Sequence, residues 1–161
     1  MSEYIRPNWP EYFMGIVDAV AKRGTCERGR SGAIIVIDKR IITTGYVGSE
    51  PGAPHCDDVG HLFEEVIHAD GTKTMHCVRT LHAEENAIIQ AAEFGVPIKG
   101  GTLYCTMVPC DRCSKRIVRV GLRKVVAKRR YHVDKRTLER FHKASIQLSI
   151  LEDKVEKYDD Q

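Results

Sequence analysis

The chain has 161 residues, of which 42% are hydrophobic and 29% charged, and it carries a net charge of +3 at neutral pH. This length allows one domain with a substantial core but not two ordinary domains, and the composition is that of a globular protein. No segment is apolar over the length of a membrane span, and the start of the chain contains no continuous apolar run. We therefore expect neither a membrane protein nor a secreted one, and place the chain in the cytoplasm.

Apolar side chains recur every three or four residues in four segments, which predicts helices, while short apolar runs bounded by glycines or charged residues predict strands. The expected elements, in chain order, are a helix over 9–22, strands over 33–37 and 41–46, a helix over 81–94, a strand over 101–106, a helix over 108–120, a strand over 124–127, a helix over 135–143 and a strand over 146–151. A strand pair followed by alternating helices and strands predicts an α/β domain of three layers, α/β/α, around a mixed five-stranded sheet.

Residues 47–76 separate the strand pair from the second helix, and regular patterning is missing from this insert. Within it we expect at most a short helix, over His61–Val66. An irregular insert of this length in a small domain is usually functional or disordered, and its histidines and cysteines favour a function. We expect the domain to occupy residues 1–151 and residues 152–161 to form a charged tail.

Positive charge is concentrated between Lys115 and Arg136, where the sequence has ten lysines and arginines and one acid. Such a stretch can mark a nucleic-acid face, but it is more often the solvated side of helices and strand ends. The chain also lacks an aromatic-interleaved basic groove on which single-stranded bases would stack. A nucleic-acid partner is therefore not the expected one.

Two short motifs carry the chemistry. The sequence H-A-E supplies His82 and Glu84, and the sequence P-C-x-x-C supplies Cys110 and Cys113. One imidazole and two thiolates provide three ligands for zinc and leave its fourth tetrahedral position open for water, as in a catalytic site. Glu84 is too close to His82 to bind the ion from the same direction, but it can carry protons to and from that water. A buried histidine beside an unrelated structural or redox C-x-x-C is the alternative, and the combination of motifs disfavours it.

Together the motifs form the H-x-E and P-C-x-x-C signature of zinc-dependent deaminases. The chain resembles the cytidine deaminase-like superfamily, and over residues 6–151 it is most similar to the deoxycytidylate (dCMP) deaminases. This resemblance implies a cytidine deaminase-like fold and zinc-dependent hydrolytic deamination of a pyrimidine nucleotide, dCMP to dUMP with ammonia release. The stretches that carry it are Arg6–Trp9, Tyr12–Met14, Cys26, Gly32–Val36, Gly45–Tyr46, Pro54–Asp57 and His82–Ile88.

Two positions depart from the pattern of that family. Ser31 stands before Gly-Ala where the first strand of the family usually begins with an apolar residue, and the second departure is at residue 47. The family's turn usually reads G-Y-N-G, with the Asn bound to the sugar hydroxyl, whereas this chain has Val47, which has no side-chain donor or acceptor. Either a backbone group or water replaces the contact, or the substrate is different, because a site built for a hydroxyl loses heavily without a partner. A deaminase of tRNA or of another nucleobase or nucleotide is therefore the alternative. A catalytically silent zinc-stabilised domain is a third, which Glu84 disfavours.

Several residues are candidates for contacts with the substrate. Tyr131 matches the aromatic residue that borders or stacks on the nucleotide in relatives, and Val47 belongs to the expected pocket wall. Ala83 must stay small if the ring packs beside it, and Arg28 is one of several cations that could contact a phosphate. Because relatives assemble as dimers or hexamers that share pockets, the resemblance also implies a homo-oligomer acting on a small-molecule nucleotide, with no membrane partner.

Three further cysteines suggest a second, structural zinc. Cys26, Cys56 and Cys77 fall in loops of the expected fold, and three soft ligands with one imidazole would close a tetrahedral site and order the long insert. The fourth ligand is His76 or His55, with His76 slightly favoured. Some bacterial and phage relatives carry an extra zinc in this region, so the resemblance supports the site. The alternative is that Cys26 and Cys77 are small core residues.

Overall fold

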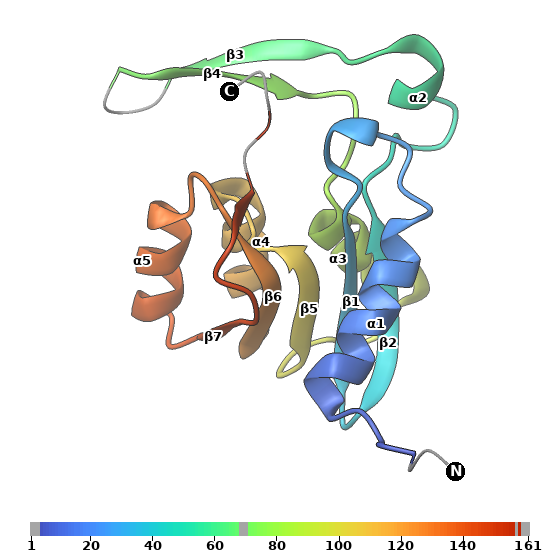
Figure 1. The fold of residues 1–161 in the computed structure, drawn as a ribbon, viewed down its shortest axis with the longest axis vertical. Helices are drawn as coiled ribbons and strands as arrows, with labels where there is room; N and C mark the ends of the chain where they lie inside the picture. Colours follow the sequence, from blue (N-terminus) through green and yellow to red (C-terminus); the bar gives the residue numbers. More distant parts are fainter. Residues whose placement is uncertain (1–3, 68–70, 157, 159–161) are drawn as a thin grey trace.

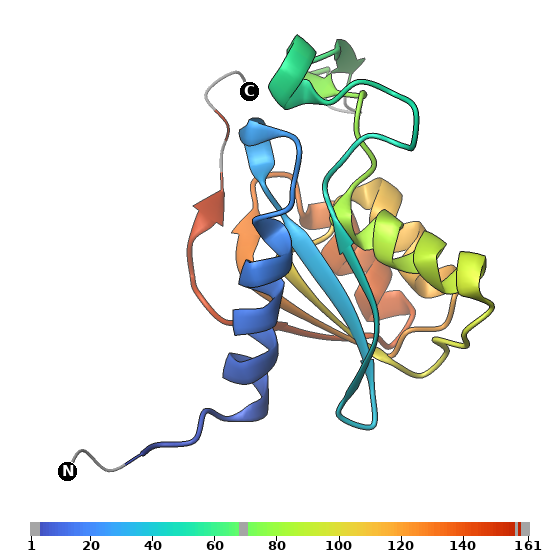
Figure 2. The same cartoon turned by 90° about the vertical axis from the view of Figure 1, so that its right-hand side faces the viewer.

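The computed structural model describes residues 4–67, 71–156 and 158. One sheet carries α1 on one face and α3, α4 and α5 on the other, which confirms the predicted three-layer α/β/α arrangement (Figures 1 and 2). In chain order the elements are α1 (Trp9–Ala21), the 3-10 helix η1 (Glu27–Gly29), β1 (Gly32–Ile37), β2 (Arg40–Tyr46), α2 (Cys56–Val59), β3 (Phe63–Ile67), β4 (Lys73–Cys77), α3 (Ala83–Phe94), β5 (Thr102–Met107), α4 (Asp111–Arg119), β6 (Lys124–Tyr131), α5 (Lys135–Lys143), β7 (Gln147–Ile150) and β8 (Val155–Glu156).

The main sheet is mixed and follows the order β2-β1-β5-β6-β7, with β8 paired to the end of β6. β1 runs antiparallel to both of its neighbours, whereas β5, β6 and β7 are mutually parallel. The sheet therefore has six strands where the sequence predicted five. The difference is β8, a two-residue strand in a charged segment that is too short to show an alternating pattern.

Side-chain alternation along β1 divides the core into two layers. Ile34 and Val36 pack with Phe13 of α1, while Ala33 and Ile35 pack on the opposite face with the other helices. Successive residues of a strand point to opposite faces, so a strand buried on both sides must be apolar throughout. This is why the run from 33 to 37 reads as continuously apolar.

The helix ends follow local rules that the sequence carries. Asn8 and Glu11 form a reciprocal capping box at the start of α1, with N–H to side-chain oxygen distances of 2.9 and 3.0 Å. Gly95 ends α3 in the left-handed conformation, with a φ of 64°. No helix within the described ranges combines the length and the hydropathy needed to cross a membrane.

Strands β3 and β4 form a separate two-stranded hairpin that extends away from the main sheet (Figure 1). The short helix predicted over His61–Val66 is therefore wrong. Phe63 pairs with Cys77 and Ile67 with Lys73, so the inward-facing backbone groups of both segments bond across the hairpin. A helix of one or two turns without tertiary contacts would be unstable, whereas Phe, Val and Ile suit a strand.

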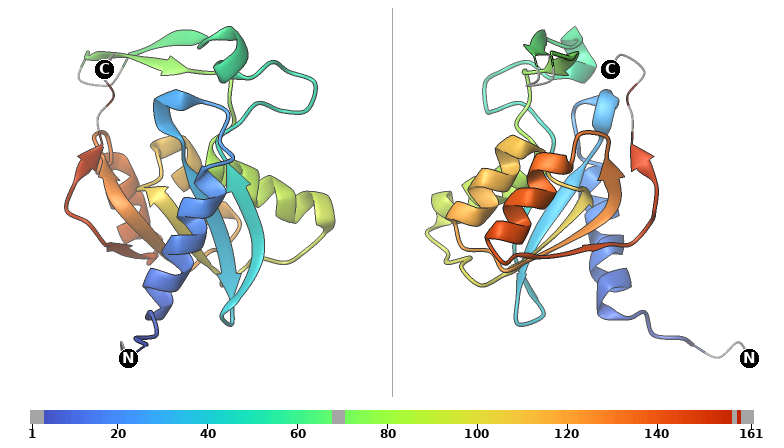
Figure 3. Two further views of the ribbon diagram at one scale, coloured as in Figure 1. Left: turned by 45° about the vertical axis from the view of Figure 1, so that its right-hand side comes forward. Right: turned by 90° about the vertical axis from the view of Figure 1, so that its left-hand side faces the viewer.

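The segment after β7 returns to the sheet, and β8 runs beside β6 (Figure 3). The N–H of Arg130 donates to the carbonyl of Lys154 at 2.8 Å, and the Arg129 guanidinium lies 2.6 Å from the Glu156 carboxylate. Residues 157 and 159–161 of the expected tail lie outside the described residues. The division at residue 151 stays a prediction.

Candidate active site

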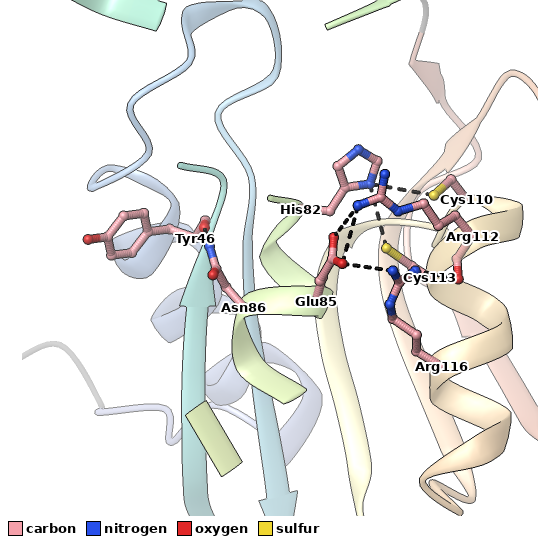
Figure 4. A network of polar contacts seen from close by, with 8 residues as sticks. All are labelled: Tyr46, His82, Glu85, Asn86, Cys110, Arg112, Cys113 and Arg116. Atoms are coloured by element: carbon pink, nitrogen blue, oxygen red, sulfur yellow. Dashed lines mark hydrogen bonds and ion pairs between the residues drawn. The ribbon is translucent and has the colours of Figure 1, made fainter. Parts of the chain in front are cut away.

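The structure brings together the three donors of the H-A-E and P-C-x-x-C motifs at the start of two helices. His82 is the N-cap of α3, Cys110 is the N-cap of α4, and Cys113 lies in the first turn of α4. The His82 Nδ1 is 3.5 Å from the Sγ atoms of both cysteines (Figure 4). Zinc–nitrogen and zinc–sulfur bonds of about 2.0–2.1 and 2.3 Å at a tetrahedral angle place the two ligand atoms about 3.6 Å apart. The donor set therefore fits a zinc ion.

The electrostatics of the triad suit a cation. The hydrogen bond with Cys113, together with His82, lowers the pKa of the Cys110 thiol to about 3 despite its burial. Burial by itself lowers the pKa of His82, but the Cys110 thiolate outweighs it and raises that pKa to about 9. Cys110 also caps the positive end of the α4 dipole. The surroundings of Cys110 thus favour its thiolate form.

Glu84 lies in the first turn of α3 and lines a cavity that also contains His82 and Cys110. Its side chain is almost completely buried, and this burial raises its pKa to about 7. At neutral pH both the protonated and the ionised form of such a carboxyl group are present, as a proton carrier requires. The arrangement therefore provides a metal site and an acid–base group at the same cavity.

Glu85, the next residue, holds the two motif helices together. Its carboxylate is buried and lies 3.0 Å from Arg112 and 2.9 Å from Arg116, both on α4 (Figure 4). The contact fixes α3, which follows His82, against α4, which carries the two cysteines. The sequence reasoning missed this role. The signal was an acid beside the motif and two arginines four residues apart on the facing helix.

Helix α5 supports the P-C turn from the other side. The Thr137 hydroxyl donates to the Pro109 carbonyl at 2.8 Å. Arg140 donates to the carboxylate of Asp111 at 2.6 Å and to the hydroxyl of Ser114 at 2.7 Å. Because Asp111 directly follows Cys110 and Ser114 directly follows Cys113, these bonds position the start of α4.

The end of β2 packs directly on α3. A Cβ at Gly45 would lie 2.2 Å from the Ala83 carbonyl oxygen and 2.4 Å from the Ala87 nitrogen, so only glycine allows this approach. The Asn86 side chain donates to the carbonyl of Tyr46 at 2.6 Å (Figure 4). The close contact places Val47, the first residue after β2, in the wall of the cavity.

Of the candidate substrate contacts, Arg28, Val47 and Tyr131 line this cavity. Ala83 does not belong to its lining and lies in the core instead, with 1% of its surface exposed. Tyr131 is the last residue of β6 rather than part of the loop after it. Tyr158, from the segment expected to be a charged tail, also lines the cavity, and nothing in the sequence pattern indicated it.

A second group of metal-ligand residues lies beside the first. Cys26, Cys56, Cys77 and His61 place their donor atoms within 4.8 Å of one another. The Cys56 and Cys77 sulfurs are 3.5 Å apart, and Cys26 Sγ is 3.7 Å from the His61 Nδ1. Tetrahedral zinc would require about 3.8 Å between sulfurs and about 3.6 Å between sulfur and nitrogen. The three predicted cysteines therefore converge, and the set is chemically suited to a closed zinc site.

The imidazole of this group is His61, neither His76 nor His55. His76 and Cys77 are consecutive residues of β4, so their side chains point to opposite faces of the hairpin. The His76 Nε2 lies 2.8 Å from the Thr74 hydroxyl, and the residue lines the cavity instead. His55 is exposed before α2. His61 was overlooked because only the histidines next to Cys56 and Cys77 in the sequence were considered as ligands.

Comparison with known proteins identifies consistent relatives. Residues 7–129 match the cytidine and deoxycytidylate deaminase zinc-binding region. The chain is 40% identical over 147 residues to ComE operon protein 2 of Bacillus subtilis, covering 91% of this chain and 73% of that protein. It is 36% identical over 143 residues to a deoxycytidylate deaminase of Schizosaccharomyces pombe, covering 89% of this chain but only 44% of that protein. The crystal structure of dCMP deaminase from the cyanophage S-TIM5, in complex with dCMP and dUMP, superposes with a TM-score of 0.72 at 26% identity and covers 91% of this chain and 99% of that one.

Proposed function

Because the chain belongs to the cytidine and deoxycytidylate deaminase family, we propose that it converts dCMP to dUMP with release of ammonia. The family is one of zinc-dependent hydrolytic deaminases. The observation that carries the proposal is the buried Glu84 beside three donors that fit zinc, at one cavity. Relatives named deoxycytidylate deaminase, and a similar structure solved with dCMP and dUMP, support the choice of substrate.

In the proposed reaction, His82, Cys110 and Cys113 would hold zinc, which when bound supplies a Lewis acid that makes water nucleophilic at neutral pH. Glu84 takes a proton from the attacking water and gives it to N3 of the cytosine while the oxygen bonds to C4. Glu84 then carries the proton of the new C4 hydroxyl to the amino group, the C4–N bond breaks as the C4 carbonyl forms, and ammonia leaves. The pKa of about 7 that burial gives Glu84 allows it to accept and release protons in turn.

The cavity walls support a nucleotide as the occupant. Arg28 offers a permanent positive charge for a phosphate, and Tyr131 offers an aromatic face beside the base or sugar. Val47 offers no side-chain donor or acceptor for the sugar hydroxyl. Ser31 and Thr80, which line the same cavity, are the hydroxyl groups that would take over this contact.

The alternative function, deamination of a polynucleotide, would rely on the basic stretch from Lys115 to Arg136 to bind the phosphates, and the structure gives that stretch another role. Half of its ten cations are engaged in ion pairs within the chain, which favours a structural role. The pairs are Lys115–Asp111, Arg116–Glu85, Lys128–Asp18, Arg129–Glu156 and Arg130–Asp134.

The proposal includes a second, structural zinc in the group formed by Cys26, Cys56, His61 and Cys77. Its role would be to hold the β3–β4 hairpin, in which β3 is exposed throughout and whose described residues form no apolar core of their own. A metal that closes a long insert stabilises it without such a core. Metal analysis of zinc-repleted protein should return two zinc ions per chain, and one per chain would remove this part of the proposal.

A substrate panel tests the proposed reaction. Zinc-loaded protein should release ammonia from dCMP faster than from CMP, dCTP or a tRNA pool, measured at equal enzyme concentration. Release from tRNA alone would overturn the proposal in favour of the polynucleotide alternative. If a nucleotide with another base reacted as fast as dCMP, the protein would still be a deaminase, but the assignment of dCMP as its substrate would be wrong.

A homo-oligomer and a cytoplasmic location stay predictions. Light scattering at the concentrations used for the assay gives the oligomeric state, and a fully active monomer would contradict the first of them.

A further inference from the structure

Arg28 occupies an unusual position at the wall of the cavity. Its guanidinium carbon lies 4.7 Å from the centre of the Phe63 ring and 5.5 Å from the centre of the Tyr158 ring. Its Nη2 donates to the Met75 carbonyl at 3.1 Å. Three segments that are distant in the sequence, the β3–β4 hairpin, η1 and the C-terminal segment, therefore meet at one guanidinium.

The Nη1 of Arg28 is buried and contacts no acceptor among the described residues. A buried donor without an acceptor is costly, and a charged one more so. Among the described residues that line the cavity, Arg28 is also the one with a permanent positive charge. A group with negative oxygen atoms in the cavity would neutralise this charge and offer the guanidinium further acceptors.

Tyr158 is placed on Arg28 by contacts of its own. Its hydroxyl donates to the Met107 sulfur at 3.4 Å, and its ring centre lies 6.4 Å from that of Tyr131. A Cβ at Gly29 would lie 2.5 Å from the Tyr158 hydroxyl oxygen, and its three nearest neighbours are all atoms of Tyr158. The glycine after Arg28 therefore leaves the space that the tyrosine ring occupies.

We propose that Tyr158 is a positioning residue of the nucleotide site, which, with Phe63, holds the Arg28 guanidinium between two rings so that Arg28 binds the phosphate of the nucleotide. This rests on the proposed function, since it requires a phosphorylated substrate. Planar stacking on aromatic faces restricts the guanidinium, and a restricted guanidinium binds phosphate oxygens with less loss of side-chain freedom. The C-terminal segment thereby contributes to substrate affinity although it carries neither motif.

A purely structural role for Tyr158 would give different results. If the ring only covered apolar surface, its loss would destabilise the protein without a particular effect on phosphate binding. If it positions Arg28, the loss must fall on ligands that carry a phosphate. The relevant comparison is therefore between dUMP and deoxyuridine, which differ only in that group.

The test measures binding of dUMP and deoxyuridine to zinc-loaded protein by calorimetry, in wild type, Tyr158→Ala and Tyr158→Phe. Tyr158→Ala should weaken dUMP binding about tenfold, the scale of a desolvated cation–π contact, and leave any measurable deoxyuridine binding unchanged. Tyr158→Phe keeps the ring and should stay within about twofold of wild type. Unchanged dUMP affinity in Tyr158→Ala, or equal losses for both ligands, would overturn the proposal.

Gly29→Ala provides an independent approach to the same contact, and serves alone if Tyr158→Ala does not fold. The added Cβ should displace the tyrosine ring and weaken dUMP binding in wild type, but should have little further effect in the Tyr158→Ala background. Equal effects in both backgrounds would count against the proposal. A wild-type protein that binds dUMP but releases no ammonia from dCMP would remove the proposed reaction and leave the positioning of Arg28 intact. A wild type that does not bind dUMP would overturn this inference.

Discussion

Replacement of Glu85 by glutamine should destabilise the protein through the contact between the two motif helices. The substitution keeps the side-chain volume but removes the charge that pairs with Arg112 and Arg116. It also turns an amide NH₂ toward two cations in a site where the acid is only 6% exposed. The effect is therefore electrostatic, with little contribution from a cavity.

The exposure of the partners sets the magnitude. Breaking a fully buried pair costs about 3–5 kcal/mol, because a charge is left without water or partner. Here Arg112 is 57% and Arg116 38% exposed, so both arginines stay hydrated when the carboxylate is lost. We therefore expect a loss of about 1.5–3 kcal/mol in the free energy of unfolding, the range for hydrogen bonds to charged groups.

Denaturant unfolding of zinc-loaded wild type and Glu85→Gln measures this difference. Glu93→Gln is the matched control, since Glu93 lies on the exposed side of the same helix and forms no ion pair among the described residues, and it should stay within about 0.5 kcal/mol of wild type. Because the contact of Glu85 with Arg112 and Arg116 aligns the zinc ligands at the starts of α3 and α4, the affinity for zinc should also fall, by about tenfold. Equal stability of Glu85→Gln and Glu93→Gln would refute the reasoning.

Three further substitutions have defined outcomes. Glu84→Gln should keep the fold and the zinc but lose a factor of about 10²–10⁴ in turnover, and wild-type turnover would contradict the proton-carrier role. His61→Ala should lower the zinc content from two ions to one per chain while His76→Ala leaves it at two, and metal analysis showing the reverse would reinstate the ligand expected from the sequence. Gly45→Ala should lower the free energy of unfolding by about 1–3 kcal/mol, measured by thermal or denaturant unfolding, because the added Cβ would lie 2.2 Å from a backbone atom. Gly15→Ala is the control and should not destabilise the protein, since its Cβ would have nothing within 4 Å. Similar losses for both variants would contradict the close approach of β2 to α3.

The elements of the three-layer domain could be predicted because their patterns are local. The apolar run at 33–37 and the spacing of alanines in α3 each follow from burial of one element against its neighbour. The β3–β4 hairpin could not be predicted in this way. Its strand Phe63–Ile67 is wholly exposed, so alternation between buried and exposed positions is absent, and pairing with β4 decides its conformation.

The same distinction between local and long-range causes applies to the residues of the site. His82, Glu84, Cys110 and Cys113 could be named because their spacing along the chain reflects two helix starts. Tyr158 could not, because its position depends on the pairing of β8 with β6 and on space left by a glycine more than a hundred residues away. His61 was missed for a related reason, since it is adjacent to none of the cysteines in the sequence and only the fold brings it to Cys26.

The central claim is hydrolytic, zinc-dependent deamination of a pyrimidine nucleotide at the site of Glu84. It is tested most directly by reaction of dCMP with zinc-loaded protein in water enriched in ¹⁸O, with mass spectrometry of the product and titration of the ammonia. The claim predicts dUMP with one ¹⁸O at C4 for each ammonia released, and a loss of both signals after removal of zinc and their return when zinc is restored. Ammonia without ¹⁸O in the base, or the same yield from metal-free protein, would contradict it.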